Sequence, residues 1–254
     1  MRDETFGLCR PEEPDRDLAC RHLSVLSNPL FSWAADLIAI VALIGTARFS
    51  LALAGMDVGT SFGGIGSSRE MLIASLAEPA MLLVVFTVAL VAGTTQLSAI
   101  AAHMIHEPVG LRVSLALAML SFVFIAVAEN ARIPIDNPAT HLELTMVHEA
   151  MVLEYSGRHL AVIEAAAALK LVLYFSLLVC MFFPFGMATN ARTLPAYALG
   201  LAAYLAKIFA LAVLLPIGET AVAKMRVFRY PIFLGGAFAA AALAVFLLFV
   251  SQRF

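Results

Sequence analysis

Charged residues are scarce in this sequence, and so are the paired cysteines that many metal centres need. Only 13% of its 254 residues are charged, and the net charge is −2. This balance leaves no basic excess for phosphates, which excludes a nucleic-acid-binding protein. Cys9, Cys20 and Cys180 form no CxxC pair, so this chain alone cannot build a zinc site or an iron–sulfur cluster. The GxSxG and HExxH motifs are also absent, so no hydrolytic machinery is indicated.

Hydrophobic residues dominate the sequence: they make up 62% of the chain, and the mean hydropathy is +0.93. About 20 residues at 1.5 Å rise each cross the roughly 30 Å of hydrocarbon in a bilayer. Continuous apolar runs near that length occur at about 34–54, 78–100, 113–129, 160–183, 195–215 and 231–250. They do not alternate with period two, and only helices or closed barrels satisfy every backbone group in lipid. The sequence therefore predicts an all-α, polytopic transmembrane helical bundle with about six spans.

The organisation before and between these runs is also readable. Residues 1–30 form a polar tail without a signal-peptide core, and residues 31–254 form the transmembrane domain. The glycine-rich run 59–70, GTSFGGIGSSRE, lacks the lysine of a P-loop. We expect it to be a flexible loop that leads into a helix at about Ser67 or Ser68.

The third loop, at about 130–158, carries most of the polar chemistry. Asn137 followed by Pro138 is typical of a helix start, and Gly157 of a helix end, which predicts an amphipathic helix to about Tyr155. Two pairs of polar side chains share faces of this helix, namely Glu143 with Glu154 and His141 with His148, whereas Glu149 lies to one side. Lysine and arginine are more frequent in the odd-numbered loops, which places this loop on the cytoplasmic side.

Several charges fall inside or at the edge of apolar runs: Arg48, Glu78, Glu164, Lys170 and Lys207. Such residues usually face a bundle interior or a water-filled cavity and mark ion or proton paths. The alternative is structural ion pairing, or snorkelling to the interface from near a helix end. Glu164 and Lys170 are six residues apart, about 240° around a helix, so each needs a partner on another helix or water.

A relay of carboxylates could exchange protons near neutral pH if burial and a nearby lysine offset each other. The predicted proton path comprises Glu78, Glu129, Asp136, Glu143, Glu149, Glu154, Glu164, Lys170 and Lys207. His103 and His106 have metal-ligand spacing beside Glu107, but a histidine pair before Pro108 is more typical of a polar helix end. We predict no metal site in this chain.

Two segments carry a resemblance to a known family. They are ARFSLALAGMDVGTSFGGIGSSREMLIASLAEPA and AENARIPIDNPATHLELTMVHEAMVLEYSG. Both closely resemble the membrane subunit of formate hydrogenlyase-type, group 4 [NiFe] hydrogenases, which is similar to subunit 1 of the NADH dehydrogenase of the respiratory chain, complex I. In the second segment, Glu129, Arg132, Pro134 and Asp136 look like the Ala-Glu-x-x-Arg-x-Pro-x-Asp pattern of complex I, whereas DNPATHLELTMVHEAM looks like the hydrogenase branch.

The resemblance implies an eight-span subunit of the cytoplasmic (inner) membrane, of which this chain would carry about six spans after a shortened N-terminus. It implies partners: antiporter-like membrane subunits, hydrogenase large and small subunits, and an iron–sulfur protein. The [NiFe] centre and the iron–sulfur clusters would lie in those partners, with no cofactor in this chain. The third loop would be the docking surface, with the candidate residues Arg132, Asp136, Asn137, His141, His148 and Arg158.

The expected function is that of a non-catalytic membrane anchor that couples redox chemistry in docked partners to proton movement through buried carboxylates. One alternative is a quinone-interacting subunit of a complex I-like NADH dehydrogenase. A free-standing ion transporter is a further alternative, against which stands the lack of inverted repeats and of paired broken helices.

Overall fold

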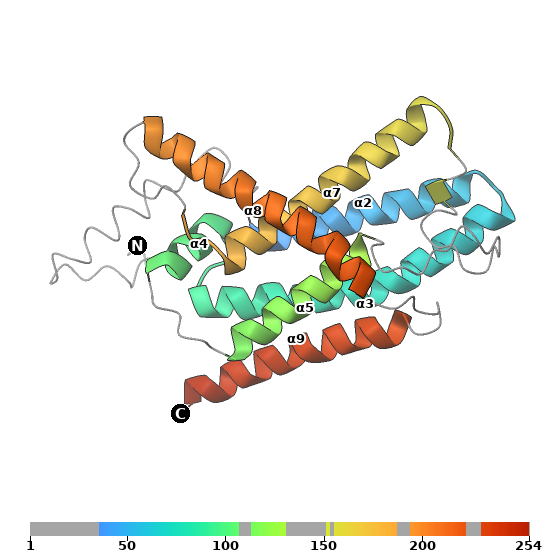
Figure 1. The fold of residues 1–254 in the computed structure, drawn as a ribbon. Coiled ribbons are helices and arrows are strands. Elements are labelled where there is room, and N and C mark those ends of the chain that lie inside the picture. Colours follow the sequence, from blue (N-terminus) through green and yellow to red (C-terminus); the bar gives the residue numbers. More distant parts are fainter. Residues whose placement is uncertain are drawn as a thin grey trace, which may run out of the picture.

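The computed structural model describes residues 36–106, 113–130, 151–152, 155–186, 194–221 and 230–253, and these residues are helical almost throughout. The helices are α2 (Leu37–Asp57), α3 (Ser61–Ala92), α4 (Leu97–His106), α5 (Val113–Glu129), α7 (Arg158–Phe182), α8 (Leu194–Ala221) and α9 (Tyr230–Arg253). They form an elongated bundle (Figure 1). Within the described ranges, extended pairing is limited to an isolated bridge between Asp36 and Gln96. The predicted all-α fold is confirmed.

Five helices, α2, α3, α7, α8 and α9, are long and apolar enough to cross a membrane. The apolar helix α5 is shorter, at 17 residues. At 1.5 Å per residue it is about 26 Å long, the lower limit for a span. The expectation of about six spans corresponds to these five long helices and the short α5.

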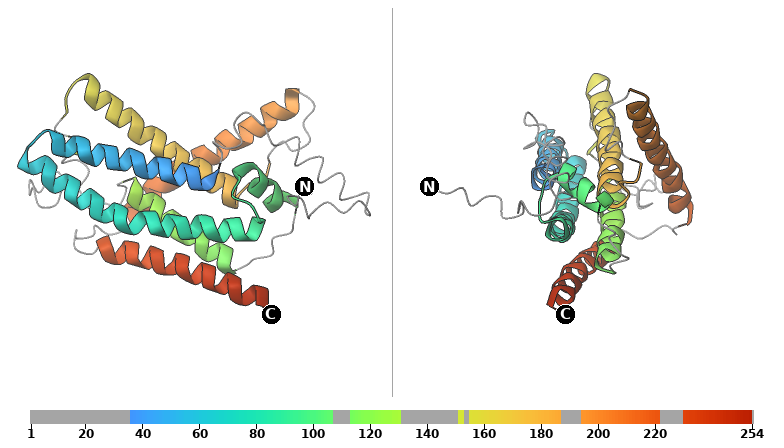
Figure 2. Two further views of the ribbon diagram at one scale, coloured as in Figure 1. Left: turned by 180° about the vertical axis from the view of Figure 1, so that it is seen from behind. Right: turned by 90° about the vertical axis from the view of Figure 1, so that its left-hand side faces the viewer.

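Helix α3 lies at the centre of the bundle and packs against α2, α5 and α9. Figure 2 shows α5 and α9 together on one side of α3 and α2 on the other. Small side chains line these interfaces: Ala77, Ala80, Ala118, Ala237 and Ala241 are fully buried. Small residues let helix backbones approach closely where lipid provides no hydrophobic driving force between helices. A polar contact joins α5 to α9, since the Ser121 hydroxyl donates to the carbonyl of Ala237 at 2.7 Å.

The glycine-rich run 59–70 corrects one expectation, because most of it is the first part of α3 and not a flexible loop. Thr60 caps the helix, its hydroxyl oxygen accepting from the Gly63 N–H at 3.0 Å. A β-carbon on Gly63 would lie 2.5 Å from the carbonyl oxygen of Gly55 in α2. Glycine therefore serves close helix packing here, and the predicted helix start at Ser67 or Ser68 was wrong by about two turns.

The far end of α3 corrects a second expectation, the continuous span at 78–100. Helix α3 ends at Ala92, and Gly93 follows with φ of 70°, a left-handed conformation that glycine adopts without steric cost. The short helix α4 begins only at Leu97. Inside α3, Pro79 follows Glu78 directly. Proline has no N–H, so the carbonyl of Ser75 lacks its usual helical donor.

Helices α7 and α8 lie at the edge of the bundle, where they cross each other (Figure 1). Helix α7 reaches the core through its C-terminal half, in which Tyr174, Leu177, Leu178 and Met181 are buried. In α8, none of the membrane-length window is buried by the rest of the described chain.

Candidate functional site: a buried ionic cluster

Four charged side chains from four helices meet inside the bundle. Arg48 of α2 pairs through Nε with Glu70 Oε1 of α3 at 3.1 Å, and through its terminal Nη2 with Glu129 Oε2 of α5. Lys170 of α7 pairs with the same Glu129 oxygen at 3.1 Å and donates to the Glu129 backbone carbonyl at 2.7 Å. We call Arg48, Glu70, Glu129 and Lys170 the ionic cluster.

Burial makes the cluster energetically important. The side chains of Arg48, Glu70 and Glu129 are 3%, 8% and 4% exposed, whereas that of Lys170 is 28% exposed. Removing one partner of a buried ion pair typically costs about 3–5 kcal/mol, because it leaves an uncompensated charge in a low-dielectric interior. The four residues are therefore held as a unit, and Lys170 is its most accessible member.

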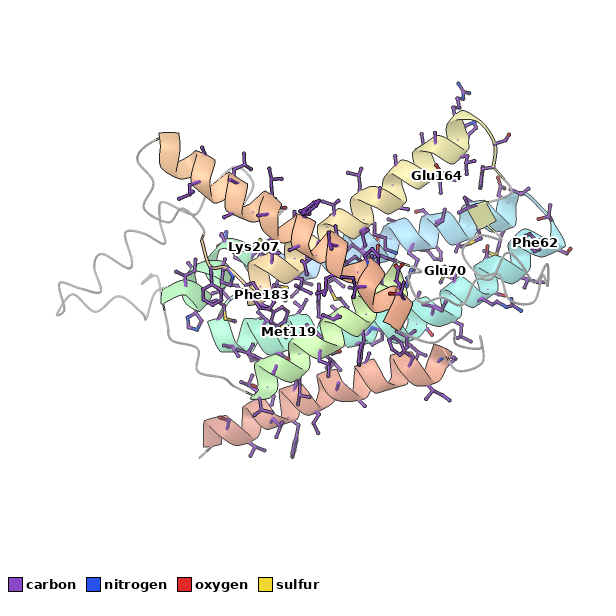
Figure 3. All side chains as sticks on the ribbon, viewed as in Figure 1. Phe62, Glu70, Met119, Glu164, Phe183 and Lys207 are labelled. Atoms are coloured by element: carbon purple, nitrogen blue, oxygen red, sulfur yellow. The ribbon has the colours of Figure 1, made fainter. Side chains whose placement is uncertain are left out.

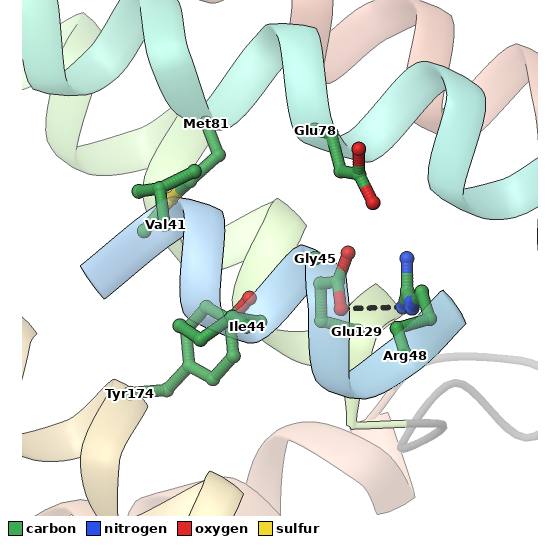
Figure 4. Close-up of a pocket in the computed structure, with 8 residues that line it drawn as sticks. All are labelled: Val41, Ile44, Gly45, Arg48, Glu78, Met81, Glu129 and Tyr174. Carbon is green, nitrogen blue, oxygen red and sulfur yellow. Dashed lines mark ion pairs between the residues drawn. The ribbon is translucent and has the colours of Figure 1, made fainter. Parts of the chain in front are cut away.

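A narrow cavity of about 10 Å³ adjoins the cluster, close to the least that holds a single water molecule. Its lining includes Glu78 and Tyr174 in addition to Arg48 and Glu129. Figure 4 shows the Glu78 carboxylate directed toward Glu129 and Arg48. Space for Glu78 comes from Gly45, where a β-carbon would lie 3.2 Å from Glu78 Oε1.

The charge balance defines what this arrangement can do. Arg48 and Lys170 supply two positive charges, and Glu70, Glu78 and Glu129 supply three negative charges when all are ionised. The five groups thus sum to one negative charge when all are ionised, and such an excess charge is costly away from water. An excess carboxylate therefore lies beside a space that can hold a water molecule.

Three residues of the predicted proton path are brought together here: Glu78, Glu129 and Lys170. The expectation that Lys170 would find its partner on another helix, and not in Glu164, is confirmed. Glu164 is exposed on α7. Lys207 donates to the carbonyls of Phe183, at 2.8 Å, and Phe185.

Lys207 and Glu164 thus lie outside the ionic cluster. Figure 3 shows Lys207 beside Phe183, and Glu164 toward the opposite end of α7. The carbonyls that bind Lys207 follow the C-terminus of α7, the end of a helix that carries partial negative charge. The position of Lys207 is thus explained by α7–α8 packing, and its place in a proton path stays a prediction.

The remaining candidates belong mostly to the third loop. Arg158 is exposed at the start of α7. The other third-loop candidates lie outside the described residues: Arg132, Asp136, Asn137, His141, Glu143, His148, Glu149 and Glu154. Of the helix predicted to run to Tyr155, Met151 and Val152 are helical and Tyr155 is not. Gly157 has φ of 59°.

Sequence reasoning does not identify two members of the cluster as site residues. Arg48 stands out as an intramembrane charge, but nothing in the sequence points to its partners. Glu70 falls in the first turn of the helix expected at Ser67 or Ser68, whereas the helix in fact begins at Ser61. The available signal is spacing, since Glu70 and Glu78 lie about two turns apart on one helix.

The fold and the cluster define a multi-pass helical membrane protein with an ion-paired polar centre. The family model for NADH dehydrogenase matches residues 19–250. The chain belongs to this family, which is related to subunit 1 of complex I.

Two curated relatives come from Escherichia coli (strain K12). Hydrogenase-4 component C is 34% identical over 199 residues, which cover 77% of this chain and 61% of that protein. Formate hydrogenlyase subunit 4 is 34% identical over 151 residues, or 59% of this chain and 48% of that protein. The chain therefore spans about half to three fifths of the length of these relatives. The resemblance seen in the sequence is confirmed.

Proposed function

We propose that this chain is a membrane anchor and proton-translocating coupling subunit of a multi-subunit hydrogenase or formate hydrogenlyase-type complex. The observation that carries the proposal is the ionic cluster, in which Glu129 bridges Arg48 and Lys170 beside Glu78. Similarity to hydrogenase-4 component C and formate hydrogenlyase subunit 4 supports the type of complex.

In this proposal the partners carry the redox chemistry. They are hydrogenase large and small subunits, an iron–sulfur protein and antiporter-like membrane subunits, and they hold the [NiFe] centre and the iron–sulfur clusters. The complex lies in the cytoplasmic membrane with loop 130–158 on the cytoplasmic side, where the hydrophilic partners dock.

Coupling is electrostatic. A change of charge at a docked redox centre alters the field at the cluster and shifts the balance between its ionised and protonated carboxyl groups. Glu129 can release its hold on one cation when it binds a proton, because the ion pairs to Arg48 and Lys170 depend on its negative charge. Glu78 then exchanges protons across the adjoining cavity.

The test is coupled proton movement in inverted membrane vesicles from the native cells. We expect Glu129→Gln to abolish redox-driven acidification or alkalinisation, followed with a pH-sensitive dye, while the partners still transfer electrons to an artificial acceptor. Asp57→Asn, at an exposed carboxylate on α2, is the matched control and keeps full coupling. Normal proton movement in Glu129→Gln would rule out the cluster as the path.

A quinone-interacting subunit of a complex I-like enzyme is the second candidate, supported by the NADH dehydrogenase family model. The cavity beside the cluster, at about 10 Å³, is far too small for a quinone ring. Quinone-site inhibitors distinguish the two candidates. Inhibition of turnover in the isolated complex favours the quinone function, and insensitivity favours the hydrogenase-type function.

A further inference from the structure

Side chains with oxygen atoms from three helices line the narrow cavity beside the ionic cluster. They are Glu78 of α3, Glu129 of α5 and Tyr174 of α7. Glu78 makes no hydrogen bond or ion pair within the described part of the chain. It is half-buried, so an ion or a water molecule can reach its carboxylate from outside the bundle.

Glu129 also has an oxygen to offer to a ligand. Its ion pairs with Arg48 and Lys170 are both made through Oε2. Figure 4 shows the other carboxylate oxygen of Glu129 directed toward Glu78. The ion pairs therefore fix the position of Glu129 and leave its Oε1 available on the side of the cavity.

Tyr174 supplies a third oxygen. This residue is 2% exposed, and its hydroxyl makes no hydrogen bond to any other described residue, although a buried tyrosine usually has a partner. Its ring packs against Phe122, with 5.9 Å between the ring centroids, and projects from α7 toward the cavity (Figure 4). A buried phenol without a partner at the wall of a cavity indicates that the cavity takes a polar occupant.

The charge around the cavity decides which kind of occupant fits. The five charged groups, Arg48, Glu70, Glu78, Glu129 and Lys170, sum to one negative charge when all are ionised. A water molecule can bond to the three oxygens, but it leaves this charge uncompensated in the bundle interior. A divalent ion exceeds the charge that has to be balanced. One monovalent cation cancels it, and oxygen atoms are the ligands that hard cations prefer.

The size of the cavity restricts the cation to a small one. At about 10 Å³ it is no larger than a single water molecule, so an ion must give up water to enter. Gly45 leaves just this space, because a β-carbon there would lie 3.2 Å from Glu78 Oε1. Carboxylate oxygens create a strong field, and in a tight site such a field favours sodium over the larger potassium ion.

We infer that this cavity is a sodium site in which Glu78, Glu129 Oε1 and Tyr174 are the ligands. The bound ion neutralises the excess carboxylate, so sodium ions and protons compete for one position. The sequence-based prediction of no metal site is then wrong at this point of the chain, because the ligands come from three helices and show no spacing pattern. Sodium binding does not depend on the proposed function, and the competition with protons does.

Binding is measured on the purified full chain in detergent micelles, by thermal unfolding in sodium, potassium or choline chloride at equal ionic strength. A ligand at about ten times its Kd raises the Tm of a chain of this size by roughly 3–6 °C. We expect this rise in sodium and little or none in the other two salts. An equal rise in sodium and potassium is a general salt effect and would overturn the inference. No rise at all, the result for a cavity that holds only water, would overturn it too.

Glu78→Gln tests the charge. It removes the excess negative charge and keeps the shape of the side chain, so we expect the sodium response to disappear. Because Glu78 takes part in no described ion pair, the variant should be no less stable than the parent chain in choline. Asp57→Asn, at an exposed carboxylate of α2, is the matched control and keeps the full response. A response that persists in Glu78→Gln would place the ion elsewhere and refute the site.

Two variants test the geometry at constant charge, each by equilibrium dialysis with radioactive sodium, where the parent chain should bind one ion. Tyr174→Phe deletes a single ligand oxygen and keeps the packing on Phe122. Gly45→Ala forces the Glu78 carboxylate to move. We expect each change to raise the Kd for sodium by about tenfold. A Kd within about twofold of the parent value in both variants would show charge attraction without a built site, and would overturn the inference.

The outcomes separate the two proposals. A sodium response that depends on Glu78, in a complex whose proton movement survives Glu129→Gln, supports the site and refutes the proposed function. Proton movement that requires Glu129, in a chain that does not respond to sodium, supports the proposed function and refutes the site.

Discussion

The coupling energy of the ion pair between Arg48 and Glu70 can be measured most directly. Among the described residues Glu70 is ion-paired with Arg48, whereas Glu129 is paired with two cations, so a change at Glu129 would disturb two ion pairs at once. Both side chains are at least nine-tenths buried. We expect Arg48→Met to destabilise the fold by about 3–5 kcal/mol, since it leaves Glu70 buried without a counter-charge. Glu70→Gln costs less, about 1.5–3 kcal/mol, because Arg48 keeps Glu129.

The double variant decides whether the pair acts as a unit. Combining Arg48→Met with Glu70→Gln removes both charges, so we expect the double variant to be more stable than the sum of the single changes by about 1–3 kcal/mol. The assay is equilibrium unfolding in mixed detergent micelles, followed by circular dichroism. The control cycle pairs Arg48→Met with Asp57→Asn, nine residues along α2, and should be additive within about 0.5 kcal/mol. Equal additivity in both cycles would refute the ion-pair reasoning.

Three further predictions concern the packing of helices; those for Gly55 and Ser121 are read from unfolding in detergent, and that for Lys207 from proteolysis. Gly55→Ala should destabilise the fold by about 1–3 kcal/mol, because the added β-carbon would lie 2.7 Å from Ser67 Oγ. The control Gly64→Ala, with open space around it, should be close to neutral, and a similar loss of stability in both variants would count against the close approach of α2 and α3. Lys207→Met should increase protease access between α7 and α8 by removing its bonds to two carbonyls, and unchanged cleavage would contradict that contact. Ser121→Ala should cost about 1 kcal/mol by deleting the bond to Ala237, and a neutral result would argue against a well-formed α5–α9 interface.

Hydropathy alone is enough to predict the helical class, because a span must satisfy its backbone internally and so leaves a run of about 20 apolar residues. It is not enough for the boundaries of α3. Glycines at 63, 64 and 66 are typical of a loop, so the local sequence predicts a loop here. The segment is helical because it packs against α2, a neighbour that the local sequence does not reveal. Tertiary contact overrides local propensity there.

The candidate site is predictable only in part for the same reason. Glu129 and Lys170 stand out because charge is rare in apolar runs, but their partners come from helices far away in sequence. Glu70 is not identified as a site residue, because the sequence predicts a helix start at Ser67 or Ser68 and so puts Glu70 in the first turn of the helix. Glu164 is equally unusual in sequence yet is exposed, because the N-terminal half of α7 has no residue buried against the rest of the described chain.

Pro79 gives the site a mechanical property. The missing hydrogen bond to the Ser75 carbonyl makes Pro79 the point at which the continuous helix α3 bends most easily, a hinge between two rods. The rod before the hinge is held to α2 through Arg48 and Gly55, and the rod after it packs into the core through Val84 and Val88. Bending at Pro79 would change how far the Arg48–Glu70 pair lies from Glu129 on α5, so movement of one end of α3 would alter the electric field at the ionic cluster.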